Sequence, residues 1–151
     1  MVINHLSFAQ NDSIKSKLDK TSDPVEKVNM LNDLCKQFWF SNLSESINFG
    51  NQALNLSRQI TYEEGEATSL NNLGVAAWVQ GDFSNALDLY FASINLRERI
   101  GGDVGLGNTY HNIGNIYRST NKLDEAIIWF EKALEIRYKI NDELGISYSK
   151  N

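Results

Sequence analysis

The chain is poor in the residue types that most often carry chemistry in proteins. Its 151 residues include one cysteine, one proline and two histidines. The single cysteine, Cys35, excludes an intramolecular disulfide and a zinc site built from cysteines. Neither His5 nor His111 has a second ligand nearby at helical spacing, so the sequence predicts no metal site and no cofactor.

The chain also lacks an excess of positive charge and any long apolar run. Its formal net charge is −5, whereas a surface that binds nucleic acid needs a basic face. No apolar stretch approaches the roughly 20 residues that cross a bilayer. We therefore expect no nucleic-acid partner and no membrane insertion in this segment.

Catalytic signals are missing as well. The acidic pairs Glu63-Glu64 and Asp124-Glu125 begin predicted helices, where the helix dipole explains them better than acid–base chemistry does. Gly101-Gly102 follows a predicted helix and not a strand, so it is not a phosphate-binding loop. These features predict a protein that is not an enzyme.

The N-terminus allows two interpretations of the compartment. Ser7 and Ala9, followed by a polar stretch, resemble the end of a secretory signal peptide, but the apolar core of such a peptide is missing. The chain is then either cytoplasmic with a leader over residues 1–22, or exported to the periplasm if Met1–Ala9 is a signal-peptide remnant. Within the leader, a short helix is expected from Ser13 to Lys20.

The dominant feature of the sequence is a repeat with a period of 40 residues. Leu73-Gly74 aligns with Ile113-Gly114, Arg97 aligns with Arg137, and no gap is needed. A fixed period in this range indicates a stacked array of small structural units. The units are assigned to residues 25–64, 65–104 and 105–144, and residues 145–151 read as the start of a truncated fourth unit.

Each unit has the periodicity of two antiparallel helices. The first helices are predicted over residues 24–40, 64–80 and 104–120, and the second helices over residues 43–60, 83–100 and 123–140. The predicted helix N-caps are Asp23, Asn42 and Asp82. The turns place Ser41, Gly81 and Asn121 in one register and Thr61, Gly101 and Asn141 in another, with glycine and asparagine suited to a left-handed backbone.

Small residues inside the helices predict close helix packing. Gly74 and Gly114 lie in the middle of first helices, where glycine costs roughly 1 kcal/mol relative to alanine. That cost is tolerable if the second helix approaches closely, and Ala86 and Ala126 are expected to face the two glycines.

These residues resemble the tetratricopeptide repeat. The resemblance lies in Asn72-Leu73-Gly74, Gly81-Asp82-Phe83 and Ala86-Leu87, and again in Asn112-Ile113-Gly114 and Asn121 to Ile127. The 40-residue spacing is similar to that of kinesin light chain and of bacterial regulatory arrays, including the sensor regions that precede histidine kinases or nucleotide cyclases. The resemblance implies an all-α, right-handed solenoid whose first helices line a concave groove that holds a peptide or protein segment.

The same resemblance implies which residues project into the groove. They are expected on the face of each first helix that lies opposite Leu73 and Ala77 in the second repeat: Asn32, Phe38, Thr68, Asn71, Asn72, Val75, Trp78, Asn108, His111, Asn112, Asn115 and Arg118, with Val28, Leu31 and Cys35 also in the first repeat. The column of Asn32, Asn72 and Asn112 is suited either to clamping a peptide backbone or to bonding neighbouring helices.

The remaining candidates also have two interpretations. Phe38 and Trp78 are either ligand anchors or core residues. Arg118 and His111 are suited to a ligand carboxylate.

We expect a protein-interaction module within a larger regulatory or signalling protein, and two rival functions stay open. In the first rival, the chain dimerises through the second helix of the third repeat, where Trp129, Ile136 and Ile140 are expected to be uncovered. In the second and weaker rival, the array is an accessory sensor region of a histidine kinase or cyclase.

Overall fold

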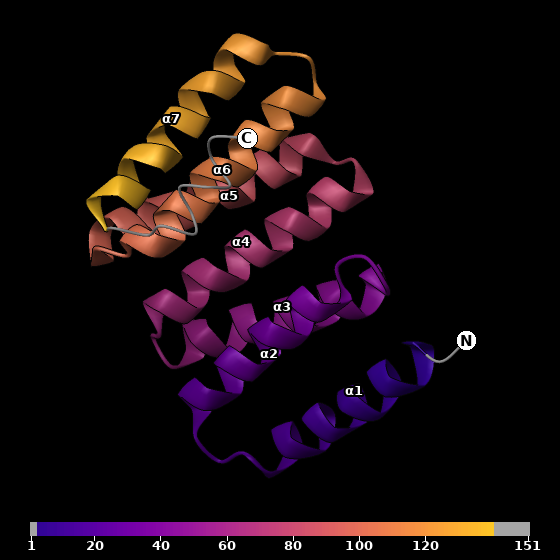
Figure 1. Ribbon diagram of the computed structural model, residues 1–151. Coiled ribbons are helices and arrows are strands. Elements are labelled where there is room, and N and C mark those ends of the chain that lie inside the picture. The colour runs from indigo at the N-terminus through magenta and orange to yellow at the C-terminus, as the bar shows by residue number, and fades with distance from the viewer. Residues whose placement is uncertain (1–2, 141–151) are drawn as a thin grey trace.

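The computed structural model describes residues 3–140, with side chains from Asp12 onward, and every secondary-structure element in this part of the chain is a helix. The helices stack in chain order from α1 at one end to α7 at the other (Figure 1). Their bounds are α1 Ile3–Lys20, α2 Pro24–Phe38, α3 Leu43–Gln59, α4 Glu63–Gln80, α5 Phe83–Ile100, α6 Asp103–Ser119 and α7 Leu123–Lys139. The predicted all-α solenoid of paired helices is confirmed, and no described helix has the length and apolar character of a membrane span.

The helix ends follow the predicted caps and turns. Asp23, Asn42 and Asp82 each accept a hydrogen bond from a backbone N–H of the first helical turn, at 3.0–3.2 Å. Among the described residues, positive φ angles occur at the predicted turn positions Thr61, Gly81, Gly101 and Asn121. The other two turn positions differ, because Ser41 keeps a negative φ and Asn141 lies outside the described residues.

The leader helix α1 is longer than expected. It begins at Ile3 rather than at Ser13, because the residues between them include neither glycine nor proline, the two residues that strongly disfavour a helix. The helix contacts the array at two described side chains. Leu18 packs in a buried cluster with Phe38 and Phe49, and Lys15 forms a salt bridge with Glu45. The proposed start of a fourth repeat, residues 145–151, lies outside the described residues.

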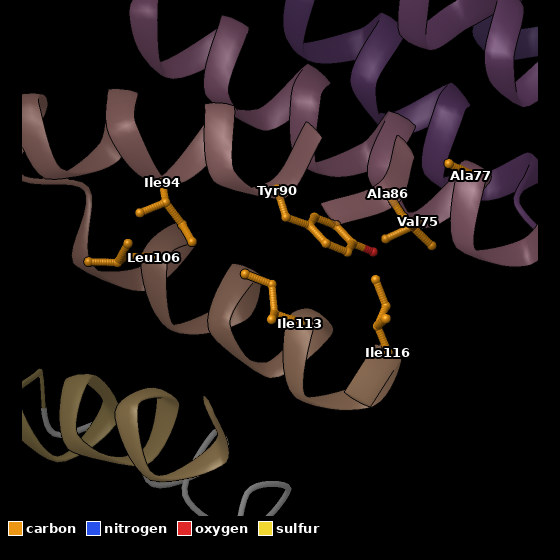
Figure 2. Close-up of a cluster of buried hydrophobic side chains, with 8 residues drawn as sticks. All are labelled: Val75, Ala77, Ala86, Tyr90, Ile94, Leu106, Ile113 and Ile116. Atoms are coloured by element: carbon orange, nitrogen blue, oxygen red, sulfur yellow. The ribbon is translucent and has the colours of Figure 1, made fainter. Parts of the chain in front are cut away.

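The main core lies between α4, α5 and α6, with the ring of Tyr90 at its centre (Figure 2). Ile113 and Ile116 of α6 lie beside this ring (Figure 2). Gly74 of α4 lies against the ring as well. A Cβ atom at Gly74 would lie 2.5 Å from Cε1 of Tyr90, so only glycine fits there. The same arrangement recurs between Gly114 and Phe130. The expectation that alanines face the glycines is therefore corrected, because aromatic rings fill the space.

The face of α7 also differs from the expectation. Trp129 is half-buried and packs its ring against Phe91 and Tyr110, at centroid distances of 5.7 and 5.6 Å. Ile136 packs against the main core and Ile140 is half-buried. The large apolar residues exposed on α7 are others: Leu123, Ile127, Ile128 and Tyr138, each more than half exposed. The phase of the helix turns Trp129 and Ile136 inward toward α5 and α6.

Candidate functional site

An open groove runs across the first helices of the three repeats and has a volume of about 630 Å³. It is lined by residues within 32–40 of α2 and the turn that follows, within 64–78 of α4 and within 104–115 of α6. Its lining residues are Asn32, Asp33, Lys36, Trp39, Phe40, Glu64, Thr68, Asn71, Asn72, Val75, Trp78, Tyr90, Arg97, Val104, Gly105, Asn108, His111, Asn112, Asn115 and Arg137.

Most residues predicted for the groove lie in it. The structure brings together Asn32, Thr68, Asn71, Asn72, Val75, Trp78, Asn108, His111, Asn112 and Asn115. Two predicted residues do not join them. Phe38 lies in the core, where its ring stacks on Phe49 with a centroid distance of 5.9 Å. Arg118 is exposed, with its guanidinium over the ring of Phe130.

The first repeat is mostly closed. Val28, Leu31 and Cys35 were expected on its concave face, but all three are buried in contacts with other helices. Burial raises the pKa of the Cys35 thiol, so this thiol is protonated and unreactive near neutral pH. At this end of the array, α2 therefore contributes to the groove through Asn32, Asp33 and Lys36.

The column of asparagines forms part of the packing between repeats. Asn72 Nδ2 donates to the backbone oxygen and to Oδ1 of Asn32, at 3.3 and 3.2 Å, and both side chains are buried. Asn32 Nδ2 donates in turn to the backbone oxygen of Gly65 at 3.3 Å. These bonds give Asn32 and Asn72 the helix-bonding role, which was one of their two interpretations. Asn112 takes a different partner, because its Nδ2 donates to Oδ1 of Asn71 at 3.1 Å.

Two buried arginines reach the groove from the second helices. Arg97 is 4% exposed and donates to Oε1 of Glu64 at 2.7 Å and to Oγ1 of Thr68 at 3.1 Å. Its guanidinium passes beneath α6, where a Cβ atom at Gly105 would lie 1.8 Å from Nη1, so glycine is required at that position. Arg137 occupies the same register in the third repeat, is 6% exposed and donates to Oδ1 of Asn108 at 3.2 Å.

The sequence contained a signal for these arginines that the prediction missed. Arg97 and Arg137 recur at the repeat period, which is unusual for a charged residue on the inner face of a helix. Trp39 and Phe40 were missed for another reason. They directly follow the last residue of α2, Phe38, where helical periodicity no longer predicts side-chain direction.

His111 lies beside the Arg137 end of the groove. Burial, Arg137 and Arg118 all lower its pKa, in that order of importance. Its ring packs against Phe130 with a centroid distance of 5.2 Å, and its buried Nδ1 has no hydrogen-bond partner among the described residues. The imidazole is therefore neutral near pH 7 and can respond to a negative charge placed nearby.

Metal chemistry finds no support in the described part of the chain. No group of three or more histidine, cysteine or acidic side chains among those residues is arranged to hold a metal ion. What the groove offers is a set of amides, two guanidinium groups and several aromatic rings, which are groups suited to binding.

The fold and groove define a helical-repeat scaffold, and comparisons with known proteins identify the family. Residues 65–139 match the family model of the tetratricopeptide repeat. Residues 65–139, which are the second and third repeats, therefore belong to the tetratricopeptide repeat family.

Relatives and solved structures agree with this assignment. Photosystem I assembly protein Ycf3 of Prochlorococcus marinus subsp. pastoris is 40% identical over 80 residues, which cover 51% of this chain and 44% of that protein. The chain thus spans less than half the length of this curated relative.

Two crystal structures share the fold. BtubC (BKLC) from P. vanneervenii has a TM-score of 0.78 and 22% identity, with 95% of this chain and 62% of that chain covered. A Rap protein complexed with Competence and Sporulation Factor has a TM-score of 0.81 and 17% identity, covering 95% of this chain and 43% of that chain. At these identities the likeness is one of fold alone.

Proposed function

We propose that this chain is a non-enzymatic protein-interaction module that holds an extended segment of a peptide or protein in the groove. The observation that carries the proposal is the set of side-chain amides on the groove surface between α4 and α6. Asn71, Asn112 and Asn115 line the groove in this region, and none of them is fully buried.

Amide groups suit the recognition of a peptide backbone. A carboxamide both donates and accepts hydrogen bonds, as a peptide unit does. Asn71 uses its Oδ1 to accept from Thr109 and Asn112, so its own Nδ2 is a donor for a ligand carbonyl. Each such bond contributes about 0.5–1.5 kcal/mol net, so several along an extended segment give useful affinity.

The similar structures are consistent with this proposal. The Rap protein that shares the fold was solved as a complex with another factor. Tetratricopeptide repeats form a concave face of this kind from the first helix of each repeat, and here α2, α4 and α6 form it.

The proposal is tested by filling the groove without disturbing the core. Asn115→Trp places a large ring in the groove from a half-buried position of α6. Asn95→Trp makes the same change at an exposed position of α5 that does not line the groove, and serves as the matched control.

A random heptapeptide library displayed on phage is selected on the immobilised wild-type chain. Peptides that bind the wild type and Asn95→Trp but not Asn115→Trp support the proposal. Peptides that bind Asn115→Trp as well as the wild type, or a selection without enrichment, would overturn it.

Self-association is a second candidate because of one observation on α7. Leu123 and Ile127 occupy the register of Phe83 and Leu87, which pack against the core formed with α6. Within residues 3–140 the equivalent face of α7 remains more than half exposed at Leu123 and Ile127. A second copy of the chain that covered this face would remove that apolar surface from water.

Light scattering separates the two candidates. A mass that rises with concentration in the wild type, and that stays monomeric in Leu123→Glu with Ile127→Lys, supports self-association through α7. A monomeric mass for the wild type at high and low concentration eliminates this second candidate.

A further inference from the structure

Three aromatic side chains from α5, α6 and α7 meet outside the groove. The ring centroid of Trp129 lies 5.7 Å from that of Phe91 and 5.6 Å from that of Tyr110. The plane of the Trp129 ring is inclined to the two other planes by 62° and 48°. None of the three residues lines the groove, and Phe91 is 39% exposed. The rings therefore form an angled aromatic surface that solvent reaches.

A cation already lies on this surface. Nζ of Lys132 is 4.4 Å from the ring centroid of Trp129 and 5.8 Å from that of Tyr110. Its side chain is exposed, and within the described part of the chain its ammonium forms neither a salt bridge nor a hydrogen bond. Both distances are within the range of about 6 Å over which a ring face attracts a cation. The ammonium is therefore held by two aromatic faces.

Two carboxylates add negative charge beside these rings. Oε1 of Glu98 accepts a hydrogen bond from the hydroxyl of Tyr110 at 3.3 Å. Burial raises the pKa of Tyr110, and the charges of Glu98 and Glu135 raise it further. The two carboxylates outnumber the one ammonium of Lys132, so the local field continues to attract a cation.

The second repeat shows which side chains helix packing alone requires at these positions. The residues one period earlier than Trp129, Tyr110 and Lys132 are Leu89, Leu70 and Ala92. Those three residues pack in an aliphatic cluster between α3, α4 and α5. The third repeat therefore has aromatic rings and a cation where aliphatic side chains are sufficient to join the helices.

The contacts of Lys132 indicate which cation the site favours. A lysine ammonium is strongly hydrated and has three N–H donors, yet here its described contacts are ring faces and include no acceptor. A quaternary ammonium carries the same charge and has no N–H donor to satisfy. It can make the same ring contacts without losing hydrogen bonds to water, as in the aromatic cages that bind choline and methylated lysine.

We propose that Trp129 and Tyr110 form a binding site for a quaternary ammonium group, in which Lys132 is a resident cation that the ligand displaces. The site lies outside the groove, so this inference does not depend on the proposed function. Two sources can present the group: the side chain of a trimethylated lysine, and a small molecule of the choline type.

The first test compares choline with 3,3-dimethyl-1-butanol, which has the same shape without the charge. Saturation-transfer NMR on the ligand methyl protons measures binding to the full wild-type chain. We expect choline to bind saturably, with a dissociation constant on the order of millimolar, and the neutral compound to bind at least about fivefold more weakly. Equal binding would mean that the surface recognises apolar groups and not charge, and would overturn the proposal.

Three variants test whether choline binds at these rings. Trp129→Leu restores the residue of the second repeat and should weaken choline binding at least about tenfold. Lys132→Gln removes the competing cation and should strengthen binding about threefold, whereas Lys132→Arg keeps a cation and should not strengthen it. Unchanged binding in Trp129→Leu, or equal affinities of the two Lys132 variants, would contradict the proposal. Circular dichroism checks folding, and Tyr110→Leu replaces Trp129→Leu if that variant does not fold.

The last comparison uses N-acetyl-trimethyllysine methylamide and its unmethylated counterpart. The trimethylated compound should bind at least about fivefold more tightly, and equal affinities would refute the preference for a quaternary ammonium. Tighter binding of the trimethylated compound than of choline supports the site with a protein side chain as the source, and the reverse order supports it with a small molecule as the source. If the wild-type chain binds neither compound, the proposal fails, even where Lys132→Gln binds them.

Discussion

The two junctions between first helices share a register but not a structure. Between α2 and α4 the amides of Asn32 and Asn72 bond directly, and α2 lies closer against α4 than α4 lies against α6. The position on the second helix that faces this junction is Gly50, and Leu73 of α4 fills the space beside it. At the same register in the next repeat stands Tyr90, whose ring lies between α4 and α6.

This difference explains why only part of the concave face is open. A missing side chain at Gly50 lets the helices of the first junction close, whereas a buried aromatic ring holds the second junction apart and itself lines the groove. The backbone follows the same plan in each repeat. The size of the one side chain at the register of Gly50 and Tyr90 decides whether two first helices pack closely or leave a surface open to a ligand.

The largest expected effect comes from removing the ring that separates α4 from α6. Tyr90 is 1% exposed, and Tyr90→Ala should lower the free energy of unfolding by about 3–5 kcal/mol, as for other large buried aromatic residues. Urea denaturation followed by circular dichroism measures this. Phe130→Ala, at the same register but only half-buried, should cost clearly less, and equal losses would contradict the central role of Tyr90.

The Asn32–Asn72 amide pair at the α2–α4 junction should contribute less to the free energy of unfolding than the ring of Tyr90 does. Asn32→Ala removes the Oδ1 that accepts from the buried amide of Asn72 and the Nδ2 that donates to the backbone oxygen of Gly65, and the loss of these buried partners costs about 1–3 kcal/mol. The matched control is Asn112→Ala at the open junction, where the amide is partly exposed and the loss should be nearer 0.5–1 kcal/mol, in the lower range for one hydrogen bond. Urea unfolding of both variants decides. A smaller loss for Asn32→Ala than for Asn112→Ala would break the distinction between the junctions.

The open junction should also respond to pH through His111. Its pKa is lowered in the folded chain relative to about 6.5 in the unfolded chain, so the unfolded chain binds more protons near pH 6. Stability from this group is complete above about pH 6.5 and is lost as the pH falls below that value. Melting temperatures at pH 7.5 and 5.5 should therefore differ more for the wild type than for His111→Asn. An unchanged difference would show that His111 does not titrate as described.

The smallest effect on stability is expected at the end of the groove that Trp39 and Phe40 line. Phe40→Ser changes a side chain that is 77% exposed, so the free energy of unfolding should change by less than about 0.5 kcal/mol. Phe49→Ser, where the ring is 6% exposed and stacks on Phe38, is the control that should be strongly destabilised. A large loss in Phe40→Ser would mean that this ring belongs to the core and is not available to a ligand.

Sequence periodicity predicted the helices well because caps and turns are local features. Asp23, Asn42 and Asp82 act on backbone groups within three residues, so their roles can be read from the sequence. The groove was harder to predict, because whether Val28 or Leu31 is exposed depends on how closely the next repeat packs. That distance depends on Gly50, which is remote in sequence from both.

The sequence also predicted the wrong phenylalanine for the groove, because periodicity does not show which face of α2 is covered: Phe40 lines the groove and Phe38 lies in the core. Periodicity placed Phe38 on the concave face, but that face of α2 is covered and Phe38 packs with Phe49. Phe40 reaches the groove only because the helix has ended, and the path of the chain after a helix end is not periodic.

The register position that Tyr90 occupies on the second helices affects how such an array can change over evolutionary time. The three repeats carry Gly50, Tyr90 and Phe130 there, a range from no side chain to a large ring on one unchanged backbone plan. A few nucleotide changes at a single codon therefore separate a junction in which two first helices pack closely from one that leaves a surface accessible to a ligand. An array built in this way can acquire or lose a ligand between two repeats while its other junctions and its turns stay as they were.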